Sequence, residues 1–417
     1  MRGCDNTAAM MNKVSTNGIK TLSGGATAAA GFEAAGVSCG VRNFGRRDLG
    51  LLVSTKECVA AAVFTRNVVQ GAPLGVTREA VEAGSLRAVV VNSGNANAAT
   101  GERGVADARE MQALAAKALN ISASEVGVAS TGVIGVHLPM QRVSSGITNA
   151  AAGLTHDTDD FANAILTTDT RIKQAAVQVE ISGKAVTVGG TAKGSGMIHP
   201  NMGTMLAFIT TDAAVEKDCL QKTLSDTTER TFNRITVDGD TSPSDMALLL
   251  ANGDADNDPL TLDSPDYTAF AEAVEFVARE LSKDIARDGE GATRLVEVVV
   301  EGAAREKDAA ALAKSVVGSS LVKAAVFGED ANWGRVVTAL GYAGIEFDPA
   351  GLDVWFGPVQ VFAHGEPVAH DEAAANAVLA GDEVVITARL SEGEASATAW
   401  GCDLTYEYVE INGSYRT

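Results

Sequence analysis

The sequence predicts an α+β fold. Apolar runs of strand length recur along the chain, and amphipathic patterns with apolar residues near i, i+3 and i+4 lie between them. The 417 residues are 46% hydrophobic and include only 9 prolines, so the chain can bury one large core or two moderate ones. No internal repeat, low-complexity segment or long linker divides it.

The expected elements follow from these patterns in chain order. In the first half, Arg87–Asn92 has the pattern of a strand and Val105–Leu119 that of a helix. The second half repeats the mixture. Its expected elements are a helix at Tyr267–Ala286, a strand at Thr293–Glu301, a helix at Arg305–Val317, and strands at Val322–Phe327, Leu352–Phe356, Val359–Ala363, Glu383–Ala388 and Asp403–Ile411.

The most loop-like stretch is Asn252–Asp266, where turn-forming residues and acids are crowded together. The spacing of Asp254, Asp256 and Asp258 resembles a calcium-binding loop. However, prolines stand at the sixth and twelfth positions, where that loop needs glycine and glutamate. A solvated turn is therefore expected here.

The net charge and the cysteine content limit which partners the protein is expected to bind and in which cell compartment it is expected to lie. A formal net charge of -20 with no basic patch argues against binding to nucleic acid or to a membrane surface. The N-terminal stretch lacks the apolar core of a signal peptide, and nowhere do 18 apolar residues run together. No C-x-x-C pair occurs among the cysteines, so we expect a cytoplasmic protein without disulfides. The five cysteines are Cys4, Cys39, Cys58, Cys219 and Cys402.

Several common catalytic motifs are absent. The five histidines never fall at H-x-x-x-H or H-E-x-x-H spacing, so no metal site is expected. Neither a Walker A loop nor a G-x-G-x-x-G between a strand and a helix occurs, so no nucleotide cofactor is expected. Ser195 lies between two glycines, but the outer positions of a nucleophile elbow are Lys193 and Met197. A serine hydrolase of that type is not expected.

Thr204 is the candidate nucleophile. A threonine hydroxyl needs an adjacent base, and the most compact solution is to make it the first residue of a chain, so that its own α-amine is the base. That requires cleavage of the Gly203–Thr204 bond, which the hydroxyl of Thr204 can itself attack. Gly203 suits this position because glycine tolerates strained backbone conformations. By itself, a Gly-Thr pair is a weak signal and better fits an ordinary threonine at the start of a strand.

The surrounding sequence resembles the ornithine acetyltransferase family, the bifunctional ArgJ proteins of arginine biosynthesis. Ordered family-like segments run from about residue 24 to the last residue. They include KGSGMIHPNMGTML (193–206), GFEAAGVSCGVRNFGRRDLGLLVS near the N-terminus, NSGNAN (92–97), STGVIG (130–135), TTDT (167–170), RITVDGDTSPSD (234–245), DGEGAT (288–293), FGEDANWGR (327–335) and the ending INGSYRT (411–417).

The resemblance implies a self-processing enzyme with an N-terminal-nucleophile-type α/β layered sandwich. The chain would be cut into an α part, Met1–Gly203, and a β part, Thr204–Thr417, which stay associated and usually pair into an α2β2 heterotetramer. The enzyme would move an acetyl group from N-acetylornithine to glutamate through an acetyl-Thr204 intermediate. Whether acetyl-CoA also serves as a donor is left open; no other cofactor is implied.

The resemblance also implies roles for individual residues. Thr131, through its hydroxyl, and Gly132, through its backbone N–H, would form the oxyanion hole. Lys193 would bind the substrate carboxylate, and Glu290 the cationic end of ornithine. The remaining family substrate positions are Thr167, Thr204, Asn412 and Thr417.

Each of these assignments has a structural alternative. Lys193 in a glycine-rich loop is ordinarily solvated, Glu290 would merely cap a strand, and Asn412 and Thr417 would be a frayed end. The sequence also departs from the family at Gly203, where alanine is usual. Pro243 and Ser244 replace a common threonine–asparagine pair, and Ala99 a common cysteine.

Three other functions remain compatible with the sequence. An amidohydrolase or aminopeptidase on the same fold would let water resolve the acyl-enzyme, and a paralogue would transfer another acyl group. A non-enzymatic protein would keep the fold and never be cut.

Overall fold

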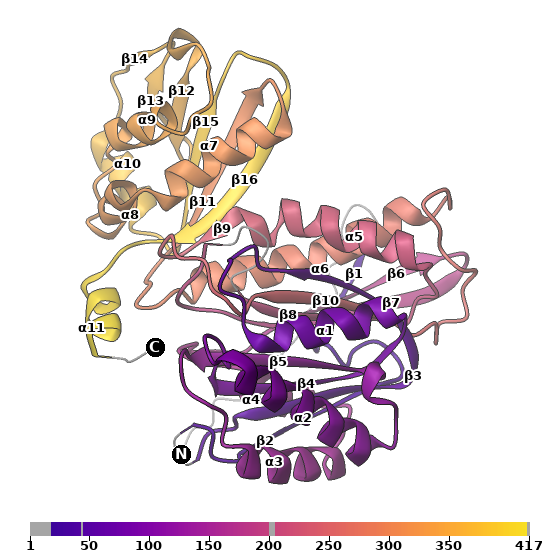
Figure 1. Cartoon of the computed structure of the whole chain (residues 1–417). Coiled ribbons are helices and arrows are strands. Elements are labelled where there is room, and N and C mark those ends of the chain that lie inside the picture. Colours follow the sequence, from indigo (N-terminus) through magenta and orange to yellow (C-terminus); the bar gives the residue numbers. More distant parts are fainter. Residues whose placement is uncertain (1–17, 43–44, 200–204, 415–417) are drawn as a thin grey trace, which may run out of the picture.

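The computed structural model describes residues 18–42, 45–199 and 205–414 of the chain. Within these residues the strands form two sheets, one of nine strands and one of seven. Figure 1 shows the larger sheet with its helices as one body, and the smaller sheet rising from it at one end.

The larger sheet has the strand order β1-β6-β7-β8-β10-β3-β4-β5, with β2 beside β3. The pairs β8/β10 and β4/β5 are parallel, and the others are antiparallel. The strands are β1 (Lys20–Leu22), β2 (Phe32–Val37), β3 (Leu49–Phe64), β4 (Leu86–Asn95), β5 (Val126–Val133), β6 (Lys173–Ile181), β7 (Lys184–Lys193), β8 (Leu206–Thr211) and β10 (Met246–Ala251).

The long strand β3 divides this sheet into two facing leaves. Its first residues pair with β2 and β4, whereas its last six pair with β10. Side chains of both leaves meet in one apolar cluster, in which Phe32 and Val91 of one leaf join Phe208 and Leu248 of the other. Because β8 and β10 are covered on both faces, every residue in them is buried, which explains their continuous apolar sequences.

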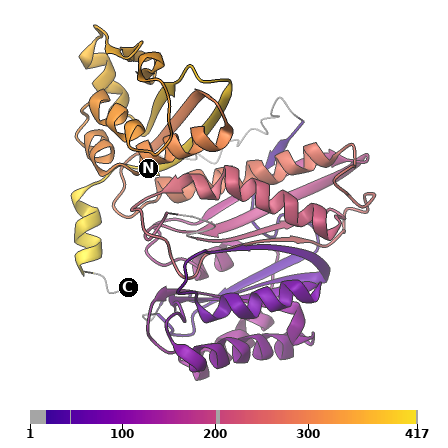
Figure 2. The same ribbon diagram turned by 45° about the horizontal axis from the view of Figure 1, so that its top comes forward.

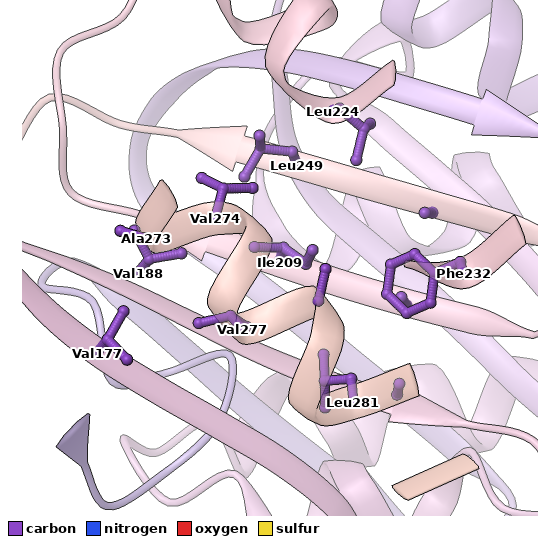
Figure 3. Packing of buried hydrophobic residues seen from close by; sticks show 14 of the residues in the cluster. Val177, Val188, Ile209, Leu224, Phe232, Leu249, Ala273, Val274, Val277 and Leu281 are labelled. Atoms are coloured by element: carbon purple, nitrogen blue, oxygen red, sulfur yellow. The ribbon is translucent and has the colours of Figure 1, made fainter. Parts of the chain in front are cut away.

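Helices cover the outer face of each leaf, so the body has four layers, α/β/β/α (Figure 2). On one side α6 inserts Val277 and Leu281 against Ile209 of β8 and Val188 of β7 (Figure 3). The helices of this body are α1 (Ala72–Ala83), α2 (Gly101–Leu119), α3 (Met140–Ala152), α4 (Asp159–Ala164), α5 (Lys217–Arg230) and α6 (Tyr267–Arg287). This arrangement confirms the layered sandwich that the resemblance implied.

The smaller sheet has the order β14-β13-β12-β15-β11-β16-β9 and an apolar core of its own. Its strands are β9 (Ile235–Thr236), β11 (Leu295–Ala303), β12 (Asp353–Phe356), β13 (Val359–Ala363), β14 (Glu366–Pro367), β15 (Glu383–Arg389) and β16 (Ala395–Cys402). Its helices are α7 (Glu306–Gly318), α8 (Ser320–Phe327), α9 (Trp333–Gly341) and α10 (Glu372–Leu379), and α11 (Tyr406–Ser414) follows β16 and returns toward the larger body (Figure 1).

Most of the expected elements are confirmed within a few residues. They are β4, α2, α6, β11, α7, β12, β13 and β15. The stretch 252–266 joins β10 to α6 as a turn-rich connection, as expected. Within the described residues, no group of three or more His, Cys, Asp or Glu is arranged to hold a metal ion.

The strand expected at Val322–Phe327 is wrong, because this segment is α8. Ser319 caps the helix by accepting a hydrogen bond from the backbone N–H of Val322 at 3.4 Å. The buried apolar residues Val322, Ala325 and Val326 follow helical spacing. Alanine-rich apolar runs of this length fit a buried helix as well as a strand.

The strand expected at Asp403–Ile411 is also wrong. The strand β16 ends at Cys402, and the carboxylate of Asp403 accepts hydrogen bonds from the backbone N–H groups of Thr293 and Arg294 at 2.8 and 3.0 Å. The chain then forms α11, in which no residue is fully buried. Its alternating aromatic and acidic residues resemble the pattern of a strand. Among the described residues, however, this segment belongs to neither sheet.

None of the described helices is by itself long and apolar enough to cross a membrane. Together α7 and α8 satisfy the length and composition requirement, but they are bent by 56° and contribute buried side chains to the core of the smaller sheet.

Candidate active site

A pocket opens on the larger body where β7 ends and where β8 and β10 begin, and α11 lies at its rim. Its empty volume is about 990 Å³, including the space at its mouth. Six residues expected at the site line it: Thr131, Gly132, Thr167, Lys193, Glu290 and Asn412. The other expected residues, Gly203, Thr204 and Thr417, lie outside the described residues, although the pocket wall includes Met205.

Thr131 and Gly132 lie near the end of β5. Gly132 has φ +128°, and a Cβ atom there would lie 2.4 Å from the carbonyl carbon of Gly94 on the adjacent strand. Only glycine fits both the conformation and the space. The shape of the backbone at this point of the pocket wall therefore depends on this residue.

Lys193 is the last residue of β7, and its side chain is 8% exposed. Its ammonium donates hydrogen bonds to the hydroxyls of Thr167 at 2.8 Å and Thr131 at 3.4 Å, and it lies 3.9 Å from a carboxylate oxygen of Asp169. Burial lowers the pKa of Lys193, and the nearby carboxylate of Asp169 offsets part of this effect. This lysine is not the solvated surface residue of the structural alternative.

A buried ion cluster holds the walls around Lys193. The ammonium of Lys173 binds carboxylate oxygens of Asp169 at 2.8 Å and Asp288 at 2.6 Å. Asp169 also accepts hydrogen bonds from the backbone N–H groups of Gly194 and Thr167. Burial alone would raise the pKa of Asp169, but Lys173 and Lys193 outweigh it and hold this pKa well below its ordinary value.

Glu290 lines the pocket together with residues of α11. It is 7% exposed, its backbone N–H donates to the carbonyl of Ser195 at 3.1 Å, and its carboxylate accepts a hydrogen bond from the Asn412 amide at 2.8 Å. A Cβ atom on Gly196 would lie 2.3 Å from that carboxylate, so the glycine leaves room for it. Neither Glu290 nor Asn412 is a strand cap or a frayed end.

The sequence interpretation missed the acidic part of the pocket. Asp238, Asp240 and Asp245 line it, and so does the phenol of Tyr408. The carboxylate of Asp238 accepts hydrogen bonds from the backbone N–H groups of Met197 at 2.6 Å and Ile198 at 2.8 Å. The only sequence signal for the three acids was their position in the family-like segment 234–245. Asp169 and Asp288 had a comparable signal in the segments 167–170 and 288–293.

The titratable groups of the pocket limit its chemistry. Among the described residues, the lining contains no histidine and no cysteine. The titratable side chains there are Lys193, the phenol of Tyr408 and carboxyl groups. Among the described lining residues, a nucleophile would therefore find carboxyl, amine and phenol groups, but no imidazole, as a base.

Comparison with known proteins agrees with this geometry. A family model described as the ArgJ family matches residues 33–417. The arginine biosynthesis bifunctional protein ArgJ of Symbiobacterium thermophilum is 59% identical over 399 residues, which are 95% of this chain and 99% of that protein. The protein of the same name from Bacillus subtilis is 48% identical over 413 residues, 98% of this chain and 100% of that protein.

A solved structure is also similar. The chain of the arginine biosynthesis bifunctional protein ArgJ from Bacillus halodurans is 49% identical with a TM-score of 0.50, and the match covers 51% of this chain and 100% of that one. The family match over most of the chain and the identities to full-length relatives lead to one conclusion. This chain belongs to the ArgJ family.

Proposed function

We propose that the chain is a glutamate N-acetyltransferase of arginine biosynthesis, which carries the acetyl group of N-acetylornithine on Thr204 and gives it to glutamate. The observation that carries the proposal is the pocket itself. Six residues, from segments between positions 131 and 412, line one cavity beside Met205, the residue that follows Thr204. ArgJ family membership and the arginine-biosynthesis names of the relatives support the pathway.

Self-cleavage between Gly203 and Thr204 is part of the proposal. The cut would fall between β7 and β8, which are hydrogen-bonded neighbours with Lys193 opposite Leu206. The two pieces would therefore remain one folded body, because the pairing of these strands does not need the peptide bond. The match to the solved Bacillus halodurans chain covers 100% of that chain but 51% of this one. The solved chain therefore has about the length of one such piece.

In the first half-reaction the α-amine of Thr204 takes the hydroxyl proton while Oγ attacks the acetyl carbonyl carbon. We assign Thr131 to the developing oxyanion, because its hydroxyl oxygen accepts a hydrogen bond from the Lys193 ammonium and the hydroxyl can in turn donate its own proton to the substrate. Gly132 would add its backbone N–H. The proton then passes to the leaving nitrogen, and ornithine departs.

In the second half-reaction the amine of glutamate attacks the acetyl-Thr204 ester, and the proton returns to the threonine oxygen as N-acetylglutamate leaves. Both substrates are α-amino acids, so one pocket has to accept a carboxylate and side chains of opposite charge. Lys193 supplies the buried cation for the carboxylate. Glu290, with Asp238 and Asp240 also lining the pocket, supplies the negative charge for the ammonium of ornithine.

The finer assignments belong to the same proposal. We propose an α2β2 heterotetramer and a cytoplasmic location, the second supported by the free thiols of Cys39, Cys58, Cys219 and Cys402. Acetyl-CoA is proposed as a second donor, because the ester on Thr204 would be the same for either donor.

Two measurements test the proposal. Intact mass under denaturing conditions should give two pieces instead of one 42.8 kDa chain, and N-terminal sequencing of the second piece should begin Thr-Met-Leu-Ala. The processed protein should then release more than one equivalent of ornithine per Thr204 from N-acetylornithine only when glutamate is present. Release at the same rate without glutamate would instead identify an amidohydrolase, and a chain that stays whole would remove the nucleophile altogether.

A further inference from the structure

The proposed reaction leaves one substrate without a hydrogen-bond donor for its side chain. The α-carboxylates of ornithine and glutamate would both pair with Lys193, so their side chains would extend toward the acidic part of the pocket. Asp238, Asp240 and Glu290 attract the ammonium of ornithine there. The same charges repel the side-chain carboxylate of glutamate. Binding of glutamate therefore needs a donor among these acids.

Tyr408 lies among the three acids. It belongs to α11 and lines the pocket. Its pKa is raised, first by burial and then by the negative charges of Asp238, Glu290 and Asp240, so these carboxylates lie around its phenol. A phenol whose pKa is raised keeps its proton at neutral pH. Tyr408 is therefore a neutral group that can donate a hydrogen bond, whereas an ionised carboxylate can only accept one.

Contacts along α11 fix the position of this tyrosine. A Cβ atom on Gly291 would lie 2.6 Å from the backbone nitrogen of Tyr408, so the two backbones are in direct contact. Before Tyr408, the hydroxyl of Thr405 donates to the carbonyl of Gly291 at 2.7 Å. One turn later, the Asn412 amide donates to the carbonyl of Tyr408 at 3.0 Å and to the carboxylate of Glu290 at 2.8 Å. The start of α11 is therefore held against the segment that carries Glu290.

Two other donors on the pocket wall are already engaged. Both hydrogen atoms of the Asn412 amide are used in the two bonds just described. The hydroxyl of Ser242 is hydrogen-bonded to the carboxyl group of Asp245. Thr168 also lines the pocket and is the rival donor for a carboxylate. Tyr408 is preferred to Thr168 because the charges of three carboxylates act on its phenol.

We propose, on the basis of the function proposed above, that Tyr408 is a specificity-determining residue for the acceptor, because its phenol donates a hydrogen bond to the side-chain carboxylate of glutamate. With ornithine in the pocket, the phenol donates to Asp238 instead, and the acids bind the ammonium. The phenol oxygen stays in place, and only its hydrogen atom changes direction. One residue thereby lets an acidic pocket accept side chains of opposite charge.

The test follows the two half-reactions separately. In a ping-pong mechanism each half-reaction exchanges label without the other substrate. Labelled ornithine enters N-acetylornithine when glutamate is absent, and labelled glutamate enters N-acetylglutamate when ornithine is absent. Tyr408→Phe keeps the ring and removes the donor. Its kcat/KM should fall about 10–100-fold in glutamate exchange, because a hydrogen bond to a charged group is lost, and less than about threefold in ornithine exchange.

Tyr406→Phe is the matched control. Tyr406 lies two residues earlier on α11, is 84% exposed and does not line the pocket. Its ring lies against that of Phe327, with the centroids 5.6 Å apart, and phenylalanine keeps this contact. Both exchanges should therefore run at the wild-type rate. Thr168→Val tests the rival donor and should not reproduce the selective loss of glutamate exchange.

The outcomes separate the two proposals. A wild-type protein that lacks one or both exchanges overturns the proposed function, and the role of Tyr408 with it. If wild type catalyses both, two unchanged or two equally reduced exchanges in Tyr408→Phe overturn the role of Tyr408 alone. A selective loss in Thr168→Val that Tyr408→Phe does not show overturns it as well. Retained ornithine exchange in Tyr408→Phe shows at the same time that the variant is folded and processed.

Discussion

The two bodies of this protein bury charge differently. In the smaller body Lys323 donates to the carbonyl of Val237 and Asp308 pairs with Arg305, whereas in the larger body several charges meet in one cluster. The core of the smaller sheet consists of aliphatic and aromatic residues such as Leu312 and Val298. The larger body buries Lys173, Lys193 and Asp169 beside an equally dense apolar core. Burying charge is costly unless it is paired, so a fold concentrates it where chemistry requires it.

The connections between the two bodies carry part of the site. Glu290 lies just before β11, and Tyr408 and Asn412 lie on α11 after β16, so the smaller sheet contributes to the pocket through the chain that enters and leaves it. Its own core sets the position of these connections. The comparison therefore predicts that substitutions at the pocket of the larger body change chemistry, whereas those in the smaller core change stability alone.

Thr204→Ala should have the largest effect. The variant lacks both the hydroxyl that cuts the chain and the one that carries the acetyl group, so kcat should fall by roughly 10⁴-fold or more. Intact mass and ornithine release measure the two losses. Thr204→Ser keeps a hydroxyl and should still be processed in part; a processed and active Thr204→Ala chain would contradict the mechanism.

Gly132→Ala should have the second-largest effect on activity. The added Cβ meets the backbone at Gly94, so the strand end has to shift and the N–H donor is lost, which costs about 2.7–4 kcal/mol of transition-state stabilisation, or 10²–10³-fold in kcat. Steady-state kinetics with N-acetylornithine measure this. Gly127→Ala on the same strand is the control, because its Cβ would meet side chains only, at 3.4 Å or more. Equal kcat values for the two variants would argue against the oxyanion role.

Asp169→Asn should lower the free energy of unfolding by about 3–5 kcal/mol at neutral pH, because it breaks a buried ion cluster. The pKa of Asp169 is lowered in the folded state, so its stabilising contribution is present above the unfolded-state pKa of about 3.9 and is lost as pH falls through the folded-state pKa. Urea unfolding at several pH values checks this. A difference from wild type that persists undiminished in strong acid would contradict the assignment.

Leu312→Ala tests the apolar side of the comparison. Leu312 is fully buried in the smaller core, and its truncation should cost about 2–5 kcal/mol of stability. At a temperature where the variant is folded, kcat should match that of wild type, because Leu312 does not line the pocket. A kcat that falls with stability would show that the two bodies do not divide their tasks in this way.

Glu79→Ala should have the smallest effect. Glu79 and Arg109 form a surface ion pair at 3.0 Å in which both side chains are about half exposed, 60% and 51%. Such pairs contribute about 0–1 kcal/mol and are screened by salt. The thermal stability of the variant at low and high salt should therefore differ little from that of wild type. A loss of several kcal/mol would contradict this expectation.

The pocket shows which of its residues could be predicted from sequence patterns and which could not. Thr131, Lys193 and Glu290 were predicted from family-like segments, and they line one pocket. Asp245 lay in a segment of the same kind but offered no feature of its own. Its place in the pocket wall near Met205 depends on the register of β8 and β10, which no local pattern encodes.

By itself, the sequence determined the family resemblance, the α+β class, the amphipathic α2, α6 and α7, and the acidic character of the chain, because these depend on composition, period and short motifs. Only the tertiary structure decided that 322–327 and 406–414 are helical, because their local patterns are ambiguous and their neighbours settle them. It likewise decided the pairing of Lys173 with Asp169 and Asp288, since burial and distance between charges follow from contacts far apart in sequence.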